Sequence, residues 1–115
     1  MNELYHIYTD NPIIILSIIV VIFFYFFKPK KINSWYGYRT QKSTQNQELW
    51  DLAQAYSAKL FLLYLTIAIF IQFITYKIIA DDGISSLLTT GIFLIVSIIA
   101  IAKTEKKLKK KQHPN

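Results

Sequence analysis

The sequence predicts an all-α membrane protein with three transmembrane helices and a cytoplasmic amphipathic helix between the first and the second. Hydrophobic residues make up 53% of the 115 residues, and they gather in three blocks, 12–27, 60–79 and 84–102, whose single charge is Lys77. A soluble domain instead interleaves charged and apolar residues every turn or two. The length suits one domain. We therefore expect a single membrane domain over residues 1–115, with spans at about 12–28, 60–79 and 84–102, a cytoplasmic loop at 29–59 and a basic tail at 103–115.

The first apolar block is shorter than the roughly 20 helical residues that a bilayer core about 30 Å thick requires. We expect it to span if Tyr5 and Tyr8 lie in the outer interface and the lysines after the block snorkel at the other end. Asn11 and Pro12 are typical of a helix start, and Pro29 ends the helix. A cleavable signal peptide is disfavoured, because no Lys or Arg precedes the block and bulky aromatic residues end it.

The distribution of basic residues predicts the orientation. Six basic residues lie between Lys28 and Lys59 and six after Ala102, whereas the N-terminus and the turn at 81–83 carry only acidic residues. The positive-inside rule places the basic side in the cytoplasm, with the N-terminus outside and the C-terminus inside. We expect the basic tail to be a solvated stop-transfer segment, and the alternative is a specific contact with anionic lipids or nucleic acid. The expected partners are the lipid bilayer and its anionic lipids, and no nucleic acid.

The second and third blocks form a predicted helical hairpin. Gly83 can take the left-handed conformation that closes a helix, and Ser85 or Ser86 can cap the next one. Polar residues fall at helical spacing on the two blocks, and a glutamine in hydrocarbon is costly unless it faces a partner. The predicted helix seam therefore contains Gln72, Thr75, Thr90 and Ser97. A substrate or proton pathway is the alternative, disfavoured because no Asp, Glu, His or Arg lies inside the spans.

The loop between the first two spans is longer than a hairpin needs, and it holds both tryptophans and the single arginine of the chain. Arg39 offers a planar fork that binds anions bidentately. Gly37, between Tyr36 and Tyr38, allows a positive φ or a close backbone approach. The functional interpretation is a structured turn that directs Arg39 at a lipid headgroup, a helix C-terminus or a partner carboxylate. The alternative is that Trp35 and the tyrosines are ordinary interfacial anchors and the arginine one more inside charge.

A helical pattern begins at Thr44, which with Gln47 fits a capping box. Apolar residues recur on one face of this segment, namely Leu49, Trp50, Ala53 and Tyr56. The segment is an amphipathic helix, either along the interface or as a cytoplasmic extension of the second span.

Signals of an enzyme are missing from the sequence. Glu48 and Asp51 lie three residues apart on an exposed helix, where they are solvated or paired with Arg39 or a lysine instead of forming a catalytic pair. His6 and His113 lie at opposite ends of the chain and on opposite sides of the membrane, and there is no Cys and no Gly-rich phosphate loop. We predict a protein that is not an enzyme, with no cofactor and no metal.

The loop also carries a family resemblance. The segment between the first two spans resembles the SdpI/YfhL family of small bacterial membrane proteins. It has a glycine, Gly37, then an aromatic residue and Arg-Thr, a tryptophan about ten residues later and an alanine three residues after that. The residues that carry the resemblance are Asn33, Trp35, Tyr36, Gly37, Tyr38, Arg39, Thr40, Ser43, Asn46, Trp50, Ala53, Tyr56 and Lys59. The chain departs from the family pattern at Gln41, where proline is frequent, and at Ala55, where a basic residue is frequent.

The resemblance implies an integral membrane protein linked to immunity against a secreted antimicrobial peptide toxin. The member after which the family is named is also linked to signalling, because it holds a transcription repressor at the membrane. The resemblance marks a motif or partner-binding set: Trp35, Tyr36, Gly37, Tyr38, Arg39, Thr40, Asn46, Trp50 and Ala53. A second hypothesis is a small membrane scaffold or accessory subunit whose basic loop and tail recruit a cytoplasmic regulator protein. A third is transport of a small solute by a homo-oligomer.

Overall fold

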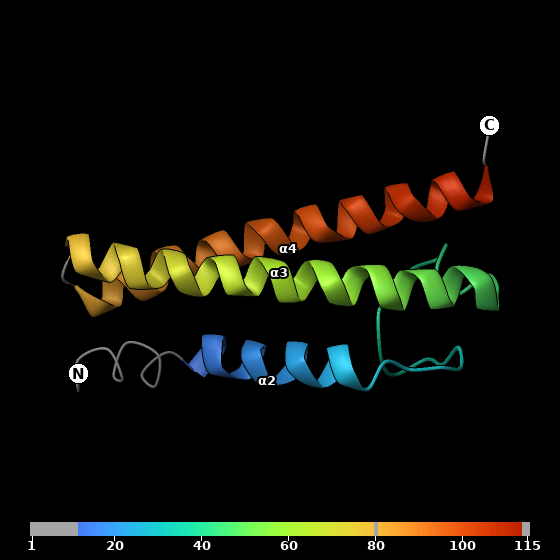
Figure 1. Cartoon of the computed structure of the whole chain (residues 1–115), viewed down its shortest axis with the longest axis horizontal. Coiled ribbons are helices and arrows are strands. Elements are labelled where there is room, and N and C mark those ends of the chain that lie inside the picture. Colours follow the sequence, from blue (N-terminus) through green and yellow to red (C-terminus); the bar gives the residue numbers. More distant parts are fainter. Residues whose placement is uncertain (1–11, 80, 114–115) are drawn as a thin grey trace.

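The computed structural model describes residues 12–79 and 81–113, without the side chain of Asp82. Its elements are α2 (Pro12–Phe26), α3 (Gln47–Ile79) and α4 (Asp82–Gln112). No strand occurs among the described residues, so the all-α prediction is confirmed for this part of the chain. The three helices run side by side in alternating directions with α3 in the middle (Figure 1). The connection between α2 and α3 and the end of α4 therefore meet at one end of the molecule, which we call the basic end.

The helix α2 comprises 15 apolar residues and ends at Phe26, slightly before the predicted limit of 27–28. At 1.5 Å per residue it is about 22 Å long, less than a bilayer core of about 30 Å. The amide of Phe27 donates to the carbonyl of Phe23 at 2.8 Å, and the ammonium of Lys28 donates to the carbonyl of Tyr25, so the helix closes before Pro29. The residues predicted to cap and extend it outward, Tyr5, Tyr8 and Asn11, lie outside the described residues.

The helix α3 is continuous over 33 residues, so the predicted amphipathic helix is an extension of the second span, one of the two courses expected for it, and forms the first part of α3. Its length of about 50 Å exceeds a bilayer core of about 30 Å by some 20 Å. The side chain of Asn46 accepts from the amide of Leu49 at 2.8 Å and caps the helix. The predicted capping box is wrong, because the hydroxyl of Thr44 donates to the carbonyl of Thr40 at 2.9 Å instead.

The helix α4 begins after Asp81, whose carboxylate accepts from the amide of Ile84 at 3.0 Å. The prediction that Gly83 takes a left-handed conformation is therefore wrong, since Gly83 lies within the first helical turn. The prediction that Ser85 or Ser86 caps the helix is also wrong, because Asp81 supplies the cap. The basic tail, predicted as a solvated stop-transfer segment, is helical and its lysines are exposed. It continues α4 as a helix to Gln112.

Two helices, α3 and α4, are long and apolar enough to cross a membrane, and α2 is a shorter apolar helix. Only 22% of the most apolar window of each long helix is buried inside the protein. The core helix of a soluble domain would be mostly buried, whereas here large side chains such as Phe70 and Leu87 face outward, 65% and 74% exposed. An apolar outer surface of this kind is what a helix in contact with lipid requires. The predicted span in α2 and the predicted orientation stay predictions.

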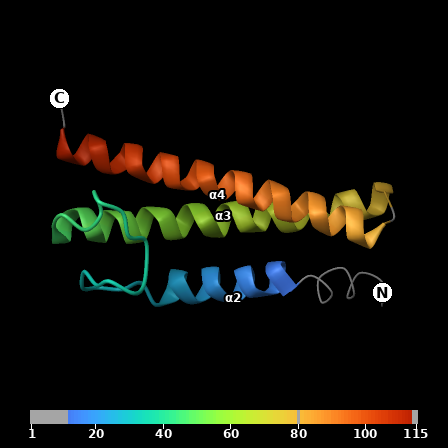
Figure 2. The ribbon, with the colours of Figure 1, turned by 180° about the vertical axis from the view of Figure 1, so that it is seen from behind.

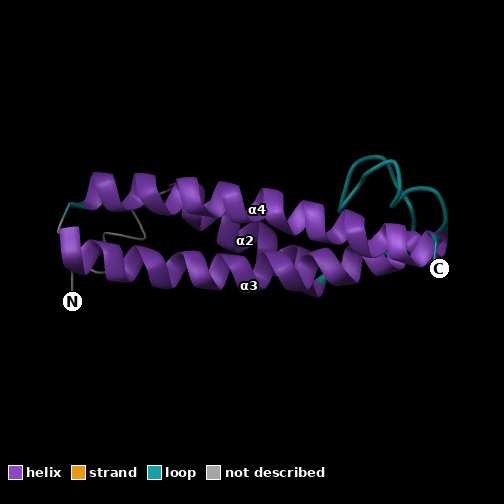
Figure 3. Cartoon of the chain, turned by 90° about the horizontal axis from the view of Figure 1, so that it is seen from above, coloured by secondary structure: helices purple, strands orange, loops and turns teal. Residues whose placement is uncertain are grey.

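The two long helices pack against each other, and α2 packs on α3. The view from behind keeps the order of Figure 1, and in the view from above α2 lies behind α3 and α4, in line with the space between them (Figures 2 and 3). Buried residues form two clusters. One, in the apolar half, contains Val21, Leu65, Ala68 and Phe93. The other, near the basic end, contains Tyr38, Leu49, Ala53 and Leu108.

Polar side chains lie between α3 and α4 near the turn at residue 81. Gln72 is fully buried; its amide nitrogen lies 3.5 Å from the hydroxyl of Ser86, and Ser85 donates to its backbone carbonyl at 3.2 Å. Of the other seam candidates, Thr75 and Ser97 donate to carbonyls of their own helices, Ile71 and Phe93 respectively, and Thr90 is partly buried. The buried Ser85 and Thr89 were not predicted for this seam.

Candidate functional site

The connecting loop (residues 27–46) folds back onto α2. The side chain of Asn33 accepts from the amides of Trp35 at 3.0 Å and Tyr36 at 2.7 Å, which closes a tight Asx turn. The hydroxyl of Tyr36 donates to the carbonyl of Phe27, and its ring packs edge-on against the rings of Phe23 and Phe24. The turn therefore places Trp35 on the outside of the molecule, where it is 78% exposed.

Gly37 occupies a position that no other residue fits. Its φ is 101°, in the positive range expected from the sequence. A Cβ atom there would lie 2.6 Å from Cγ of Pro29 and 2.7 Å from Oε1 of Gln54. A side chain at this position would therefore be strained at this φ and would displace Pro29 or Gln54.

Gln54 fixes the next residue. The amide of Tyr38 donates to its Oε1 at 2.8 Å, and its Nε2 donates back to the carbonyl of Tyr38 at 2.7 Å. One buried side chain thereby satisfies both backbone groups of a buried loop residue, which would otherwise be costly to leave unpaired.

Two further side chains of α3 hold the start of the loop. Trp50 is fully buried, and its indole nitrogen donates to the carbonyl of Pro29 at 2.8 Å. The amide of Gln47 donates to the carbonyl of Lys30 at 2.6 Å. Ala53, also fully buried, gives the room in which Tyr38 packs beside Leu49. The amphipathic part of α3 is therefore the scaffold of the loop.

The loop is also bonded to the basic part of α4. The hydroxyl of Tyr38 donates to the carbonyl of Ile101 at 3.3 Å, and the hydroxyl of Thr40 donates to the carboxylate of Glu105 at 3.2 Å. Burial, together with the nearby negative charge of Glu105, raises the pKa of Tyr38. The hydroxyl of Ser43, fully buried, accepts from the amide of Thr40 at 2.7 Å.

Arg39 is exposed, and its guanidinium donates to the carbonyl of Ser34 within the same loop. The acidic residues of the amphipathic segment have other partners, since Glu48 pairs with Lys111 at 2.8 Å and Asp51 accepts from Gln47 at 2.7 Å. The Glu48 pair is exposed and contributes little stability. Within the described residues no group of three or more His, Cys, Asp or Glu side chains could hold a metal ion.

A groove of about 590 Å³ lies between α2 and α4 and ends at the loop. Its walls are almost entirely apolar and include Leu16, Val20 and Phe24 of α2, Phe61 of α3, and Phe93 and Ile101 of α4. Residues 36–40, with Arg39 among them, line its end. Ser17 and Ser97 also line it, and their small side chains leave space between the two helices.

The structure therefore brings most of the predicted motif together, namely Tyr36, Gly37, Tyr38, Arg39, Thr40, Asn46, Trp50 and Ala53, whereas Trp35 points outward. The predicted seam residues Gln72, Thr75 and Thr90 lie elsewhere, in the apolar half. Gln54 and Glu105 were missed. One signal in the sequence could have indicated Gln54, which follows Trp50 by four residues and so shares its helix face. Another could have indicated Glu105, which is the one acidic residue in the basic tail.

Comparison with known proteins identifies the family. The sequence profile of the SdpI/YfhL protein family matches residues 30–103, which contain most of the loop, α3 and the apolar part of α4. The chain is 39% identical over 92 residues to YfhL of Bacillus subtilis (strain 168), an uncharacterized protein, and the match covers 74% of this chain and 72% of YfhL. No solved structure matches the chain significantly. With a profile that spans more than half of the chain and a relative of this identity, the chain belongs to the SdpI/YfhL protein family.

Proposed function

We propose that this protein is a non-catalytic, multi-pass protein of the bacterial plasma membrane, with its N-terminus outside and its C-terminus in the cytoplasm, that protects the cell against a secreted antimicrobial peptide toxin. Family membership and the two long apolar helices support this proposal. The observation that carries it is the fixed form of the connecting loop, which is bonded to α3 through Gln54 and Trp50 and to α4 through Glu105.

Such a loop suits recognition better than catalysis. Its buried polar groups are used to hold the backbone in place, as in the paired bonds between Gln54 and Tyr38. The groups it presents outward are the indole of Trp35 and the guanidinium of Arg39, a pair of side chains enriched at binding surfaces. At the membrane surface these groups would meet a partner that lies on or in the bilayer.

A toxin challenge tests the proposal. Cells lacking the gene and cells expressing it are exposed to culture supernatant of a toxin-secreting strain, and survival is counted. We expect survival to require the protein and to be lost in Gly37→Val and in Trp50→Ala at normal abundance, because each change displaces the loop. Gly91→Ala is the matched control, since a Cβ at Gly91 meets no atom within 4 Å. Equal survival of cells with and without the gene would overturn the proposal.

A second candidate function is a scaffold that recruits an acidic cytoplasmic partner. The observation that favours it is the helical form of the basic tail, in which Leu108 packs inward while the lysines are exposed, namely Lys103, Lys106, Lys107, Lys109, Lys110 and Lys111. A photo-crosslinking residue at Lys110 should capture such a partner in cells, and replacing Lys106 and Lys109 by Gln in that protein should abolish capture without changing toxin survival. Absence of any crosslinked protein would refute this candidate.

A further inference from the structure

We propose that the groove between α2 and α4 binds one anionic phospholipid, with its phosphate at Arg39 and one acyl chain along the apolar walls. This lipid site does not depend on a toxin. It requires only that the basic end lies at the surface of the bilayer.

The position of the groove along the helices matches the depth at which a phospholipid lies in a bilayer. The apolar stretch of α4 ends at Ala102 and Lys103 follows, and the hydroxyl of Tyr38 donates to the carbonyl of Ile101 at 3.3 Å. The loop therefore closes the groove at the level where α4 leaves its apolar stretch. From Ile101 the groove reaches Phe93, eight residues or about 12 Å further into the apolar half. A phospholipid with its headgroup at the loop would lay the upper part of its acyl chain along this length.

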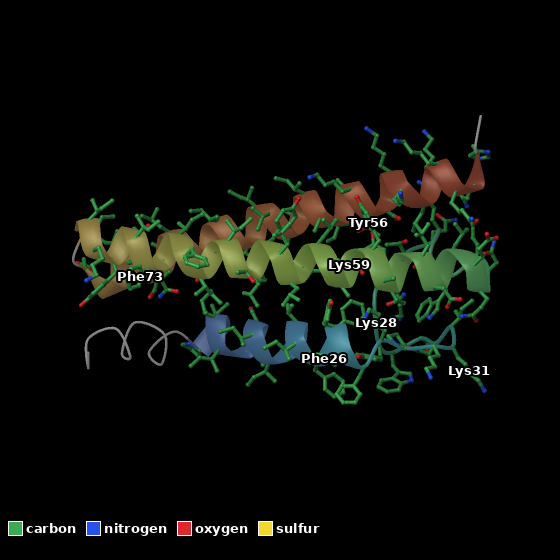
Figure 4. The ribbon with its side chains drawn as sticks, in the orientation of Figure 1. Phe26, Lys28, Lys31, Tyr56, Lys59 and Phe73 are labelled. Atoms are coloured by element: carbon green, nitrogen blue, oxygen red, sulfur yellow. The ribbon has the colours of Figure 1, made fainter. Side chains whose placement is uncertain are left out.

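The chemistry of the closed end fits a phosphate. A guanidinium carries five N–H donors, and the bond from Arg39 to the carbonyl of Ser34 uses part of them and orients the fork. An arginine fork binds phosphate oxygens bidentately. The loop has further positive charge in Lys28, Lys30 and Lys31, which favours an anionic headgroup over a neutral one. In Figure 4 the labelled Lys28 and Lys31 lie on this loop at the basic end.

The size of the groove favours an acyl chain over a helix of a second copy or of a peptide. Its volume of about 590 Å³ lies within the range of small-molecule sites. The groove extends over only about 12 Å of helix length, about two helical turns, which is too short a seat for a helix long enough to span a bilayer core of about 30 Å. The narrow, open-sided shape accommodates a flexible chain without moving α2.

The test is native mass spectrometry of the purified protein in detergent, titrated with phosphatidylglycerol or with phosphatidylcholine of the same acyl chains. We expect the wild type to bind one phosphatidylglycerol about tenfold more tightly than phosphatidylcholine. Arg39→Gln should remove most of this preference, because it loses the charged fork. Ser97→Leu should weaken both lipids about tenfold, because it fills the groove between the helices.

Matched controls separate these effects from general damage. Lys110→Gln removes an exposed charge of α4 outside the groove and outside the loop, and Thr66→Leu replaces an exposed α3 residue that, like Ser97, donates to its own helix. Both should bind as the wild type does. Equal binding of the two lipids by the wild type, or unchanged binding in Ser97→Leu, would overturn the proposal. So would a wild-type dimer that Ser97→Leu dissociates, since a second copy would then occupy the groove.

Discussion

Replacement of Gly37 by alanine should release the connecting loop from α3. The structure sets the magnitude in two parts. A non-glycine residue at a φ of 101° costs about 1–3 kcal/mol. The new Cβ would also lie 2.7 Å from Oε1 of Gln54, so the amide must move and weaken two bonds to Tyr38, each worth about 0.5–1.5 kcal/mol. Together these effects should destabilise the docked loop by about 2–6 kcal/mol.

The fluorescence of Trp50 reports this release. In a Trp35→Phe background Trp50 is the single tryptophan, and it is fully buried against Pro29. We expect Gly37→Ala to shift its emission to longer wavelength and to increase proteolysis within residues 33–45, while both long helices stay folded. Gly91→Ala in the same background should leave both readouts unchanged. Wild-type emission and protease resistance in the Gly37→Ala protein would refute this account of the loop.

Three further predictions concern charge and topology. The raised pKa of Tyr38 favours folding most below pH 10.0, its ordinary pKa, so the melting temperature should fall as the pH rises above that value, and less steeply in Tyr38→Phe. Arg39→Lys should protect cells as poorly as Arg39→Ala, because lysine keeps the charge and loses the planar fork, whereas Lys30→Ala should reduce protection only mildly. Equal protection by Arg39→Lys and the wild type would contradict this prediction. A cytoplasmic reporter should be active after the last residue and inactive at Asp82, and a cysteine at the exposed Gln41 should resist labelling from outside intact cells.

The parts of the fold that depend on local composition could be predicted from the sequence. The apolar blocks indicated the helices, since charge-free stretches of this length leave few other structures, and the placement of Gly37 between two tyrosines indicated a special backbone conformation. The continuity of α3 was also available in principle, because Gln47–Ile79 contains no Gly or Pro. The change from amphipathic to apolar composition left two courses open, along the interface or as an extension of the second span, since that change alters the surroundings of a helix and not its backbone.

The parts of the site that depend on distant contacts could not be predicted. Gln54 pairs with Tyr38 across 16 residues, and Thr40 meets Glu105 across 65 residues. Neither pair is implied by spacing along one helix, because each requires the loop to fold back first. Asp81 shows the same limit at smaller scale, since several nearby polar residues could have capped α4 and only the local turn decides which one does.

The unbroken length of α3 has a mechanical consequence for the protein. The loop is bonded to the first two turns of a helix whose last turn is at the opposite end of the molecule, through Gln47, Trp50 and Gln54. Loop and helix therefore move as one rigid lever about 50 Å long. A tilt of about 10°, well within the range that transmembrane helices adopt, displaces the loop by about 9 Å relative to the far end. In the proposed orientation, a contact at the outer end of the helices would thus reposition Arg39 by a tilt alone, without any change in the fold of α3.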